Sequence, residues 1–254
     1  MPDWTPILNA GKRGVKSALQ HAGLEIRRKC HQVGAVEALA RIADNSGCSM
    51  VLDVGANEGE FVQELRRHGY SGDVISFEPR SAAFHQLEQC TFHDSRWVAE
   101  RVALGAERGN VRINISGNGV SSSVLPMQSL HLDAAPDAAY VATEEVPQDR
   151  LDDLVLSHLP DEAQLLFKLD VQGYEAAVLE GAPEVLRRTV ALQLELSLAP
   201  MYNGQADWRQ LMSDLRRLDF ELWTLEPVLT DQRTGRTLQV DVVMQRCKPS
   251  LRPD

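Results

Sequence analysis

The sequence predicts an α/β fold with a Rossmann-like, mostly parallel sheet that ends in an antiparallel pair of strands. From residue 50 onwards, short β-rich runs alternate with helical patterns of about ten residues. This alternation is typical of parallel strands joined by crossover helices. Near the C-terminus two strand-like runs follow each other without a helix between them, so we expect them to pair antiparallel. With 254 residues, the chain is long enough to form one large α/β domain.

The predicted elements follow in order along the chain. The parallel strands are the apolar runs Met50–Val54, Val74–Phe77, Trp97–Leu104, Leu165–Val171 and Val190–Ser197. Helical patterns cover residues 60–70, 81–90, 173–188 and 208–218. The antiparallel pair is Phe220–Leu225 and Leu238–Met244, joined by a loop that contains Gly235. This layout resembles that of class I methyltransferases, whereas NAD-binding Rossmann sheets usually stay parallel.

Residues 1–49 are expected to form an N-terminal helical extension, and residues 50–248 the main domain. The extension carries seven Lys or Arg and four Asp or Glu, with basic residues gathered at 12–16 and 27–29. One interpretation is a basic amphipathic helix that makes a peripheral contact with anionic lipid or a polyanionic partner. The other is the solvated face of an accessory helix.

Composition excludes several classes of protein. The net charge of −10 argues against a nucleic-acid partner, because phosphate binding requires a basic surface. The chain has no apolar run of the roughly 18 to 20 residues that span a membrane, and no basic-then-apolar secretory signal. Cys30, Cys48, Cys90 and Cys247 stand far apart, which disfavours a disulfide framework or a zinc site. We therefore expect a cytoplasmic protein with reduced thiols.

The stretch MVLDVGANEGEF predicts a ligand-binding turn between the first strand and the first crossover helix. Gly55 and Gly59 allow the backbone to turn sharply and approach a ligand. Their spacing is not the GxGxxG of dinucleotide-binding folds. Asp53 and Glu58 would repel a pyrophosphate and attract a ligand that carries an ammonium and a sulfonium group. The turn therefore favours S-adenosylmethionine over NAD.

Two further strand ends add candidate cofactor contacts. Glu78, in VISFEP, ends the second strand and can accept hydrogen bonds from both ribose hydroxyls, although it could instead cap the next helix. Ala103 and Leu104, at the end of the third strand, either form a slot for the adenine ring or belong to the ordinary hydrophobic core. In SGNGVSSSVLP, Ser122 and its neighbours either form a lid over the cofactor or a flexible surface loop.

Six motifs together resemble the FkbM family of S-adenosylmethionine-dependent methyltransferases. They are VLDVGANEGEF, VISFEP, RVALGAERGNVRI, VPQDRLDDL, FKLDVQGYEAAVLEGA and LQLELS, and they span roughly residues 50–197. The resemblance implies a class I methyltransferase fold and O-methylation of sugars, glycolipids or polyketide-type natural products. It assigns cofactor binding to Asp53, Gly55, Asn57, Gly59 and Glu78. It also implies that Asp170 faces the transferring methyl, and Gln172 stands where many members have glutamate.

Methylation of a hydroxyl requires a nearby base or metal, because a protonated alcohol is a poor nucleophile. Asp170 ends the fourth strand and Glu195 lies near the end of the fifth, so a carboxylate pair is expected at one edge of the sheet. The pair would act as the base or bind a divalent cation, and we expect no metal because the catechol-type Asp-Asn pair is missing. Lys168 either orients Asp170 or forms a buried ion pair that steadies the sheet.

Two other functions remain open at this point. One is an NAD(P)-dependent oxidoreductase on a related sheet, against which the glycine spacing and the antiparallel end both argue. The other is a non-catalytic cofactor-binding scaffold, which could dispense with Asp170 and Glu195. The sequence names neither the acceptor nor the oligomeric state.

Overall fold

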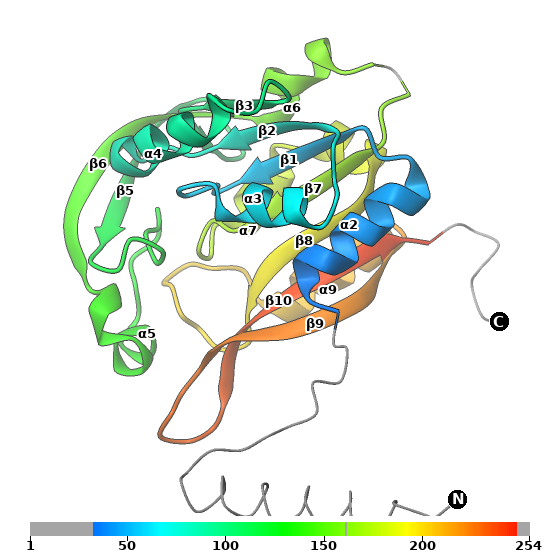
Figure 1. The fold of residues 1–254 in the computed structure, drawn as a ribbon. Coiled ribbons are helices and arrows are strands. Elements are labelled where there is room, and N and C mark those ends of the chain that lie inside the picture. Colours follow the sequence, from blue (N-terminus) through cyan, green and yellow to red (C-terminus); the bar gives the residue numbers. More distant parts are fainter. Residues whose placement is uncertain (1–32, 161, 248–254) are drawn as a thin grey trace, which may run out of the picture. The chain divides into compact units, whose positions relative to one another are not determined.

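A seven-stranded sheet with the order β3-β2-β1-β7-β8-β10-β9 carries the fold (Figure 1). The structure, a computed structural model, describes residues 33–160 and 162–247. The strands are β1 Met50–Val54, β2 Asp73–Phe77, β3 Trp97–Glu100, β7 Leu165–Leu169, β8 Thr189–Ser197, β9 Phe220–Thr230 and β10 Thr237–Arg246. The first five are parallel neighbours, and β10 pairs antiparallel with both β8 and β9. The predicted mostly parallel sheet with an antiparallel end is confirmed.

The central strands are apolar because both faces of the sheet are covered. All five residues of β7 are buried, as are four of the five in β1. Two charged residues interrupt these runs, and the register places them side by side: Asp53 of β1 is the Cα partner of Lys168 of β7. A pair of opposite charges thus lies in the most buried part of the sheet.

A second sheet of three strands lies beside the first, in the order β4-β6-β5. Its strands are β4 Ala103–Leu104, β5 Gly109–Ser116 and β6 Tyr140–Asp149. The sequence reading missed it: the expected strand Trp97–Leu104 breaks after Glu100, and its last two residues pair with β6 instead of β2. The alternation of Val111, Ile113 and Ile115 was the available signal, since Ile113 packs with Ala103 and Val146 in a small core.

Helices cover both faces of the seven-stranded sheet. They are α2 Ala35–Ser46, α3 Glu60–Arg67, α4 Ser81–Thr91, α6 Leu151–Val155, α7 Glu175–Glu180, α8 Pro183–Arg188 and α9 Trp208–Arg217. The short helix α5 Ser129–Ala134 lies apart from this sheet, beyond β5 (Figure 1). The main hydrophobic core joins α6, α7, α8 and α9 to one face of the sheet. Helix α2 crosses β8 and β10 on the face opposite α9 (Figure 1).

Helix α2 belongs to the same compact unit as the sheet, and this unit begins at Gly34. Its buried side chains include Leu39 and Ile42, which explains why this part of the expected extension folds onto the sheet. The basic groups at 12–16 and 27–29, with their expected lipid or polyanion contact, lie outside the described residues. No helix in the described ranges has both the length and the hydropathy that a membrane span needs.

Candidate cofactor and catalytic site

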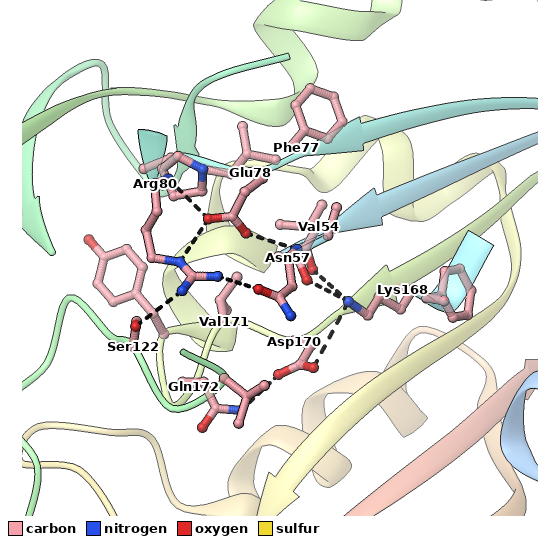
Figure 2. Close-up of a pocket in the computed structure, with 18 of the residues that line it drawn as sticks. Val54, Asn57, Phe77, Glu78, Arg80, Ser122, Lys168, Asp170, Val171 and Gln172 are labelled. Carbon is pink, nitrogen blue, oxygen red and sulfur yellow. Dashed lines mark hydrogen bonds and ion pairs between the residues drawn. The ribbon is translucent and has the colours of Figure 1, made fainter. Parts of the chain in front are cut away.

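A cavity of about 480 Å³ opens where the carboxyl ends of β1, β2 and β7 meet the second sheet. Open α/β sheets bind their ligands in this kind of crevice. Eight of the expected site residues line it: Gly55, Asn57, Glu78, Ala103, Leu104, Ser122, Lys168 and Asp170. Figure 2 shows Glu78 and Arg80 facing Asn57, with Lys168 and Asp170 farther along the same cavity. The expected residues Asp53, Gly59 and Glu195 do not line it.

The turn after β1 must contain glycine at position 55. Gly55 has a φ of +74°, and a Cβ there would lie 1.9 Å from the backbone carbonyl oxygen of Asp170. Its N–H donates to the Phe77 carbonyl at 3.0 Å, and its carbonyl accepts from Lys168 Nζ at 2.7 Å. The ends of β1, β2 and β7 are therefore drawn together at a point where no side chain fits.

Asn57 and Glu78 form the polar wall of the cavity. The Asn57 N–H donates to Glu78 Oε2 at 2.9 Å, which requires the left-handed backbone of Asn57, with a φ of +50°. Glu78 is only 3% exposed. Gly59, by contrast, packs against Trp97 and Leu87 at the start of α3, where a Cβ would lie 2.8 Å from the Trp97 ring. Gly59 therefore has a packing role, in place of the expected contact with the cofactor.

Asp53 lies beneath the glycine turn and has no exposed surface. Its Oδ1 is 3.2 Å from Lys168 Nζ, and its Oδ2 accepts a hydrogen bond from Ser76 Oγ at 2.8 Å. Burial opposes the positive charge of Lys168, but Asp53 and Asp170 more than offset this effect and raise the pKa of the ammonium. Asp53 therefore acts on the cavity through Lys168. It does not line the cavity, so the expected direct contact with the cofactor is replaced by this ion pair.

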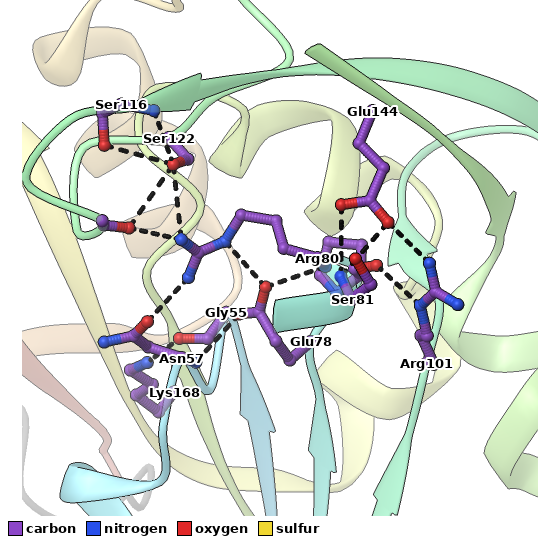
Figure 3. Close-up of polar contacts among 12 residues, drawn as sticks. Gly55, Asn57, Glu78, Arg80, Ser81, Arg101, Ser116, Ser122, Glu144 and Lys168 are labelled. Atoms are coloured by element: carbon purple, nitrogen blue, oxygen red, sulfur yellow. Dashed lines mark hydrogen bonds and ion pairs between the residues drawn. The ribbon is translucent and has the colours of Figure 1, made fainter. Parts of the chain in front are cut away.

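Arg80 is a site residue that was not predicted from the sequence. Its Nε donates to Glu78 Oε1 at 2.9 Å and its Nη2 to Asn57 Oδ1 at 2.7 Å. Its Nη1 donates to the Gly119 carbonyl and reaches Ser122 Oγ at 3.4 Å (Figure 3). One guanidinium thus ties the end of β2 to the serine-rich loop. The only sequence signal was an arginine two positions after the acidic residue.

The apolar wall comes from the small second sheet. Ala103 and Leu104 are 5% and 3% exposed and line the cavity together with Ile113 and Val124. Tyr174 lines the cavity as well, and its hydroxyl lies 3.3 Å from the side-chain oxygen of Gln148. An apolar wall beside a buried carboxylate is suited to a base and its ribose.

Asp170 and Glu195 have different surroundings, although one amide connects them. The Gln172 Nε2 group donates to Asp170 Oδ1 at 2.8 Å and to Glu195 Oε2 at 2.9 Å. Asp170 lines the cavity, is 42% exposed at its side chain and lies 4.0 Å from Lys168 Nζ. Glu195 also accepts from Gln239 Nε2 at 2.6 Å, and burial raises its pKa well above the ordinary value. The expected carboxylate pair exists, but only Asp170 faces the cavity.

A further carboxylate that lines the cavity, Asp241 of β10, was also missed. The Gln193 Nε2 group donates to Asp241 Oδ2 at 3.2 Å, and both residues line the cavity. Burial is the main reason why the pKa of Asp241 rises to about 7, and the negative charge of Asp170 adds to it. A lone aspartate in the otherwise apolar run VDVVM was the signal that sequence reasoning could have used.

The strand order, the glycine turn and the acidic end of β2 define a class I methyltransferase fold that binds S-adenosylmethionine. Residues 53–222 match the methyltransferase FkbM domain, and the chain belongs to this family. It is therefore an S-adenosylmethionine-dependent methyltransferase, and the alternative prediction of an oxidoreductase is wrong.

Several known proteins are similar to the chain. The 2-O-methyltransferase NoeI of Sinorhizobium fredii is 25% identical over 206 residues, which cover 78% of this chain and 80% of NoeI. An rRNA methylase from Streptococcus thermophilus is 16% identical with a TM-score of 0.47, covering 88% of this chain and 99% of its own. The magnesium protoporphyrin IX methyltransferase of Synechocystis PCC 6803, solved with bound SAM, is 10% identical with a TM-score of 0.44, covering 84% and 78%.

Proposed function

We propose that this protein transfers a methyl group from S-adenosylmethionine to a hydroxyl oxygen of a sugar, glycolipid or related natural product. The observation that carries the proposal is one continuous cavity that runs from Glu78 and the apolar wall, past Gly55 and Asp170, to Asp241. The first part suits a nucleoside, and the second suits a polar acceptor. The glycine turn between them brings the two ligands within reach of each other.

The residues present fit the methyl donor. A volume of about 480 Å³ lies within the roughly 300 to 1,000 Å³ of small-molecule sites. Gly55 lines the cavity and has no side chain that would stand between its backbone and a ligand. Glu78 Oε1 already accepts two hydrogen bonds from Arg80, whereas Oε2 accepts only the Asn57 N–H and keeps a lone pair for a ribose hydroxyl. When bound, S-adenosylmethionine supplies a methyl group on a positively charged sulfur, which the neighbouring Asp170 carboxylate favours.

The charges at the acceptor end favour an uncharged polar substrate. Glu60 and Glu64 of α3 line this end together with Asp170 and Asp241, so a phosphate or carboxylate on the acceptor would be repelled. An aromatic ring, Phe61, lines the same end. Carboxylates, an amide and one ring are the groups that bind neutral sugars through hydroxyl hydrogen bonds and ring packing. The similarity to a 2-O-methyltransferase supports oxygen as the acceptor atom.

The test has two steps. Calorimetry with S-adenosylhomocysteine and with NAD should give heat only for the first, and Glu78→Ala should abolish it because the ribose loses its hydrogen-bond acceptor. Labelled S-adenosylmethionine is then incubated with neutral glycosides, glycolipids and their uronic-acid counterparts, and products are read by mass. We expect an added methyl on a neutral hydroxyl compound. Binding without turnover on every compound would instead favour a non-catalytic scaffold.

Asp170 provides the control for catalysis. Asp170→Ala should still bind S-adenosylhomocysteine, since Asn57 and Glu78 are untouched, but should lose turnover of the labelled substrate. Normal turnover in this variant would contradict the placement of the reacting methyl beside Asp170.

A further inference from the structure

The acceptor end of the cavity is built from elements that take no part in the nucleoside end. The strand order places β8 and β10 on the far side of β7 from β2, so their side chains enter the cavity opposite Glu78. Gln193 of β8 and Asp241 of β10 lie there, with Val36 of α2 across from them. Asp170 and Gly55 stand between the two ends. An acceptor bound at this end would therefore contact Gln193 and Asp241.

Gln193 holds Asp241 in a fixed orientation. Gln193 is 6% exposed, and its Nε2 donates to Asp241 Oδ2 at 3.2 Å. Its Oε1 is buried and has no hydrogen-bond partner in the described part of the chain. A buried amide oxygen without a donor is unusual, because leaving it unpaired costs about 1 to 3 kcal/mol. The pair thus offers two oxygen acceptors, and hydroxyl groups are the donors that suit them.

The other candidate bases near this end are less well placed. Glu60 and Glu64 are exposed on α3. Asp170 lies 4.0 Å from Lys168 Nζ and accepts the Gln172 amide. Glu195 accepts two amide groups and does not line the cavity. His131 packs edge-on against Tyr202, with 5.2 Å between the ring centroids, and is also outside the cavity lining. Asp241 lies at the acceptor end and its bond to Gln193 leaves Oδ1 for the acceptor, whereas the oxygen of Asp170 that accepts no hydrogen bond, Oδ2, faces Lys168 Nζ at 4.0 Å.

We propose that Asp241 is the general base that takes the proton from the acceptor hydroxyl, and that Gln193 positions it and receives a second hydroxyl of the same acceptor. The inference rests on the proposed function and specifies its acceptor as a molecule with neighbouring hydroxyl groups, such as a sugar ring. Gln193 is a positioning residue, since it acts through the orientation of Asp241.

The proposed step balances in atoms and charge. The acceptor oxygen forms a bond to the methyl carbon while its O–H bond breaks and the proton moves to an Asp241 carboxylate oxygen. The bond between that carbon and the sulfonium sulfur breaks, and both its electrons stay on sulfur. The products are a methyl ether, neutral S-adenosylhomocysteine and a protonated Asp241. The carboxylate's negative charge and the sulfonium's positive charge disappear together.

The surroundings of Asp241 suit this role near neutral pH. Burial raises its pKa to about 7, with Asp170 and Glu226 adding to the rise and Lys168 opposing it. Glu195 is its Cα partner on β8 and Glu226 its partner on β9, while α2 presents the apolar Val36 to the cavity. A base whose pKa lies near the working pH is both available and strong enough to accept the proton. Turnover should therefore rise with pH as Asp241 ionises.

The central experiment compares Asp241→Asn with Glu221→Gln. Glu221 is an exposed carboxylate on the neighbouring strand β9 and serves as the matched control. The assay counts tritiated methyl transferred to a pool of neutral methyl glycosides between pH 5.5 and 9. We expect Asp241→Asn to lose about 100-fold or more in turnover and to lose its pH dependence, while Glu221→Gln behaves as wild type. Calorimetry should give the same S-adenosylhomocysteine affinity for all three proteins, which also reports that they are folded.

Two further measurements separate a base from a structural carboxylate. Formate should restore part of the turnover of Asp241→Ala, since it replaces the missing carboxylate. Carbon-13 NMR should show Asp241 titrating near pH 7 in the S-adenosylhomocysteine complex. Full activity of Asp241→Asn with an unchanged pH profile, or titration of Asp241 below about pH 5, overturns the proposal. If the wild type labels no glycoside, the sugar acceptor is wrong, and the NMR titration, which needs no acceptor, still decides on Asp241.

Discussion

Removing Lys168 should destabilise the protein more than any surface charge change, because it leaves a carboxylate buried without a cation. Lys168 is 6% exposed, and its Nζ lies 3.2 Å from Asp53 Oδ1 and 2.7 Å from the Gly55 carbonyl. In Lys168→Met the side chain keeps its volume, but Asp53 retains only the Ser76 hydroxyl at 2.8 Å. Removing one member of a buried ion pair costs about 3 to 5 kcal/mol.

The partner substitution should cost less. Asp53→Asn leaves Lys168 near Asp170, whose side chain is 42% exposed, so the ammonium keeps a counter-charge. A loss of about 1 to 3 kcal/mol is expected from the altered hydrogen bonds. The double variant Asp53→Asn/Lys168→Met should be less destabilised than the sum of the two, by about 1 to 3 kcal/mol.

Urea unfolding at pH 7, followed by circular dichroism, measures the free energies of the four proteins. Arg41→Met is the matched control, since Arg41 forms an exposed pair with Glu37 and should change stability by about 0.5 kcal/mol or less. The pKa of Lys168 is raised in the folded protein, so the stabilisation by its charge is present below the unfolded-state pKa of about 10.4 and is lost only above it. The coupling energy from the double-mutant cycle should therefore be the same at pH 6 and pH 9. A loss below about 1 kcal/mol for Lys168→Met, or strict additivity, would refute the ion pair's role.

Three other changes test the site. Gly55→Ala should unfold the turn and lower Tm with loss of S-adenosylhomocysteine binding, because a Cβ would meet the Asp170 carbonyl at 1.9 Å; an unchanged Tm contradicts this. Arg80→Ala should free the serine-rich loop, seen as faster amide exchange at 117–122 and weaker S-adenosylhomocysteine binding. Arg101→Ala, which removes an exposed pair with Glu144 and a hydrogen bond to the Pro79 carbonyl but no contact with that loop, should not. Burial raises the pKa of Glu175 to about 7, so the folded state holds its proton between the ordinary value of 4.5 and pH 7, and stability falls as pH rises through this range. Glu175→Gln should remove that fall and stabilise the protein by about 3 kcal/mol at pH 8, measured by urea unfolding, and equal pH slopes for both proteins would argue against it.

Local patterns predicted much of the fold. The apolar runs, the helical patterns between them and the missing helix before Leu238 are properties of neighbouring residues, so the parallel sheet and its antiparallel end were readable. The second sheet was not, because β4 is two residues long and pairs with β6, more than forty positions away. A strand of that length has no pattern of its own.

The sequence by itself determined the glycine turn, the acidic end of β2 and the candidate Asp170, because each follows directly from a strand end. Only the tertiary structure decided which charges meet: Asp53 lies under the turn against Lys168, while Asp241 reaches the cavity from a strand that pairs antiparallel with β8. The physical reason is that the role of a carboxylate depends on its burial and on the charge beside it. Both are set by strands that are neighbours in space and distant along the chain.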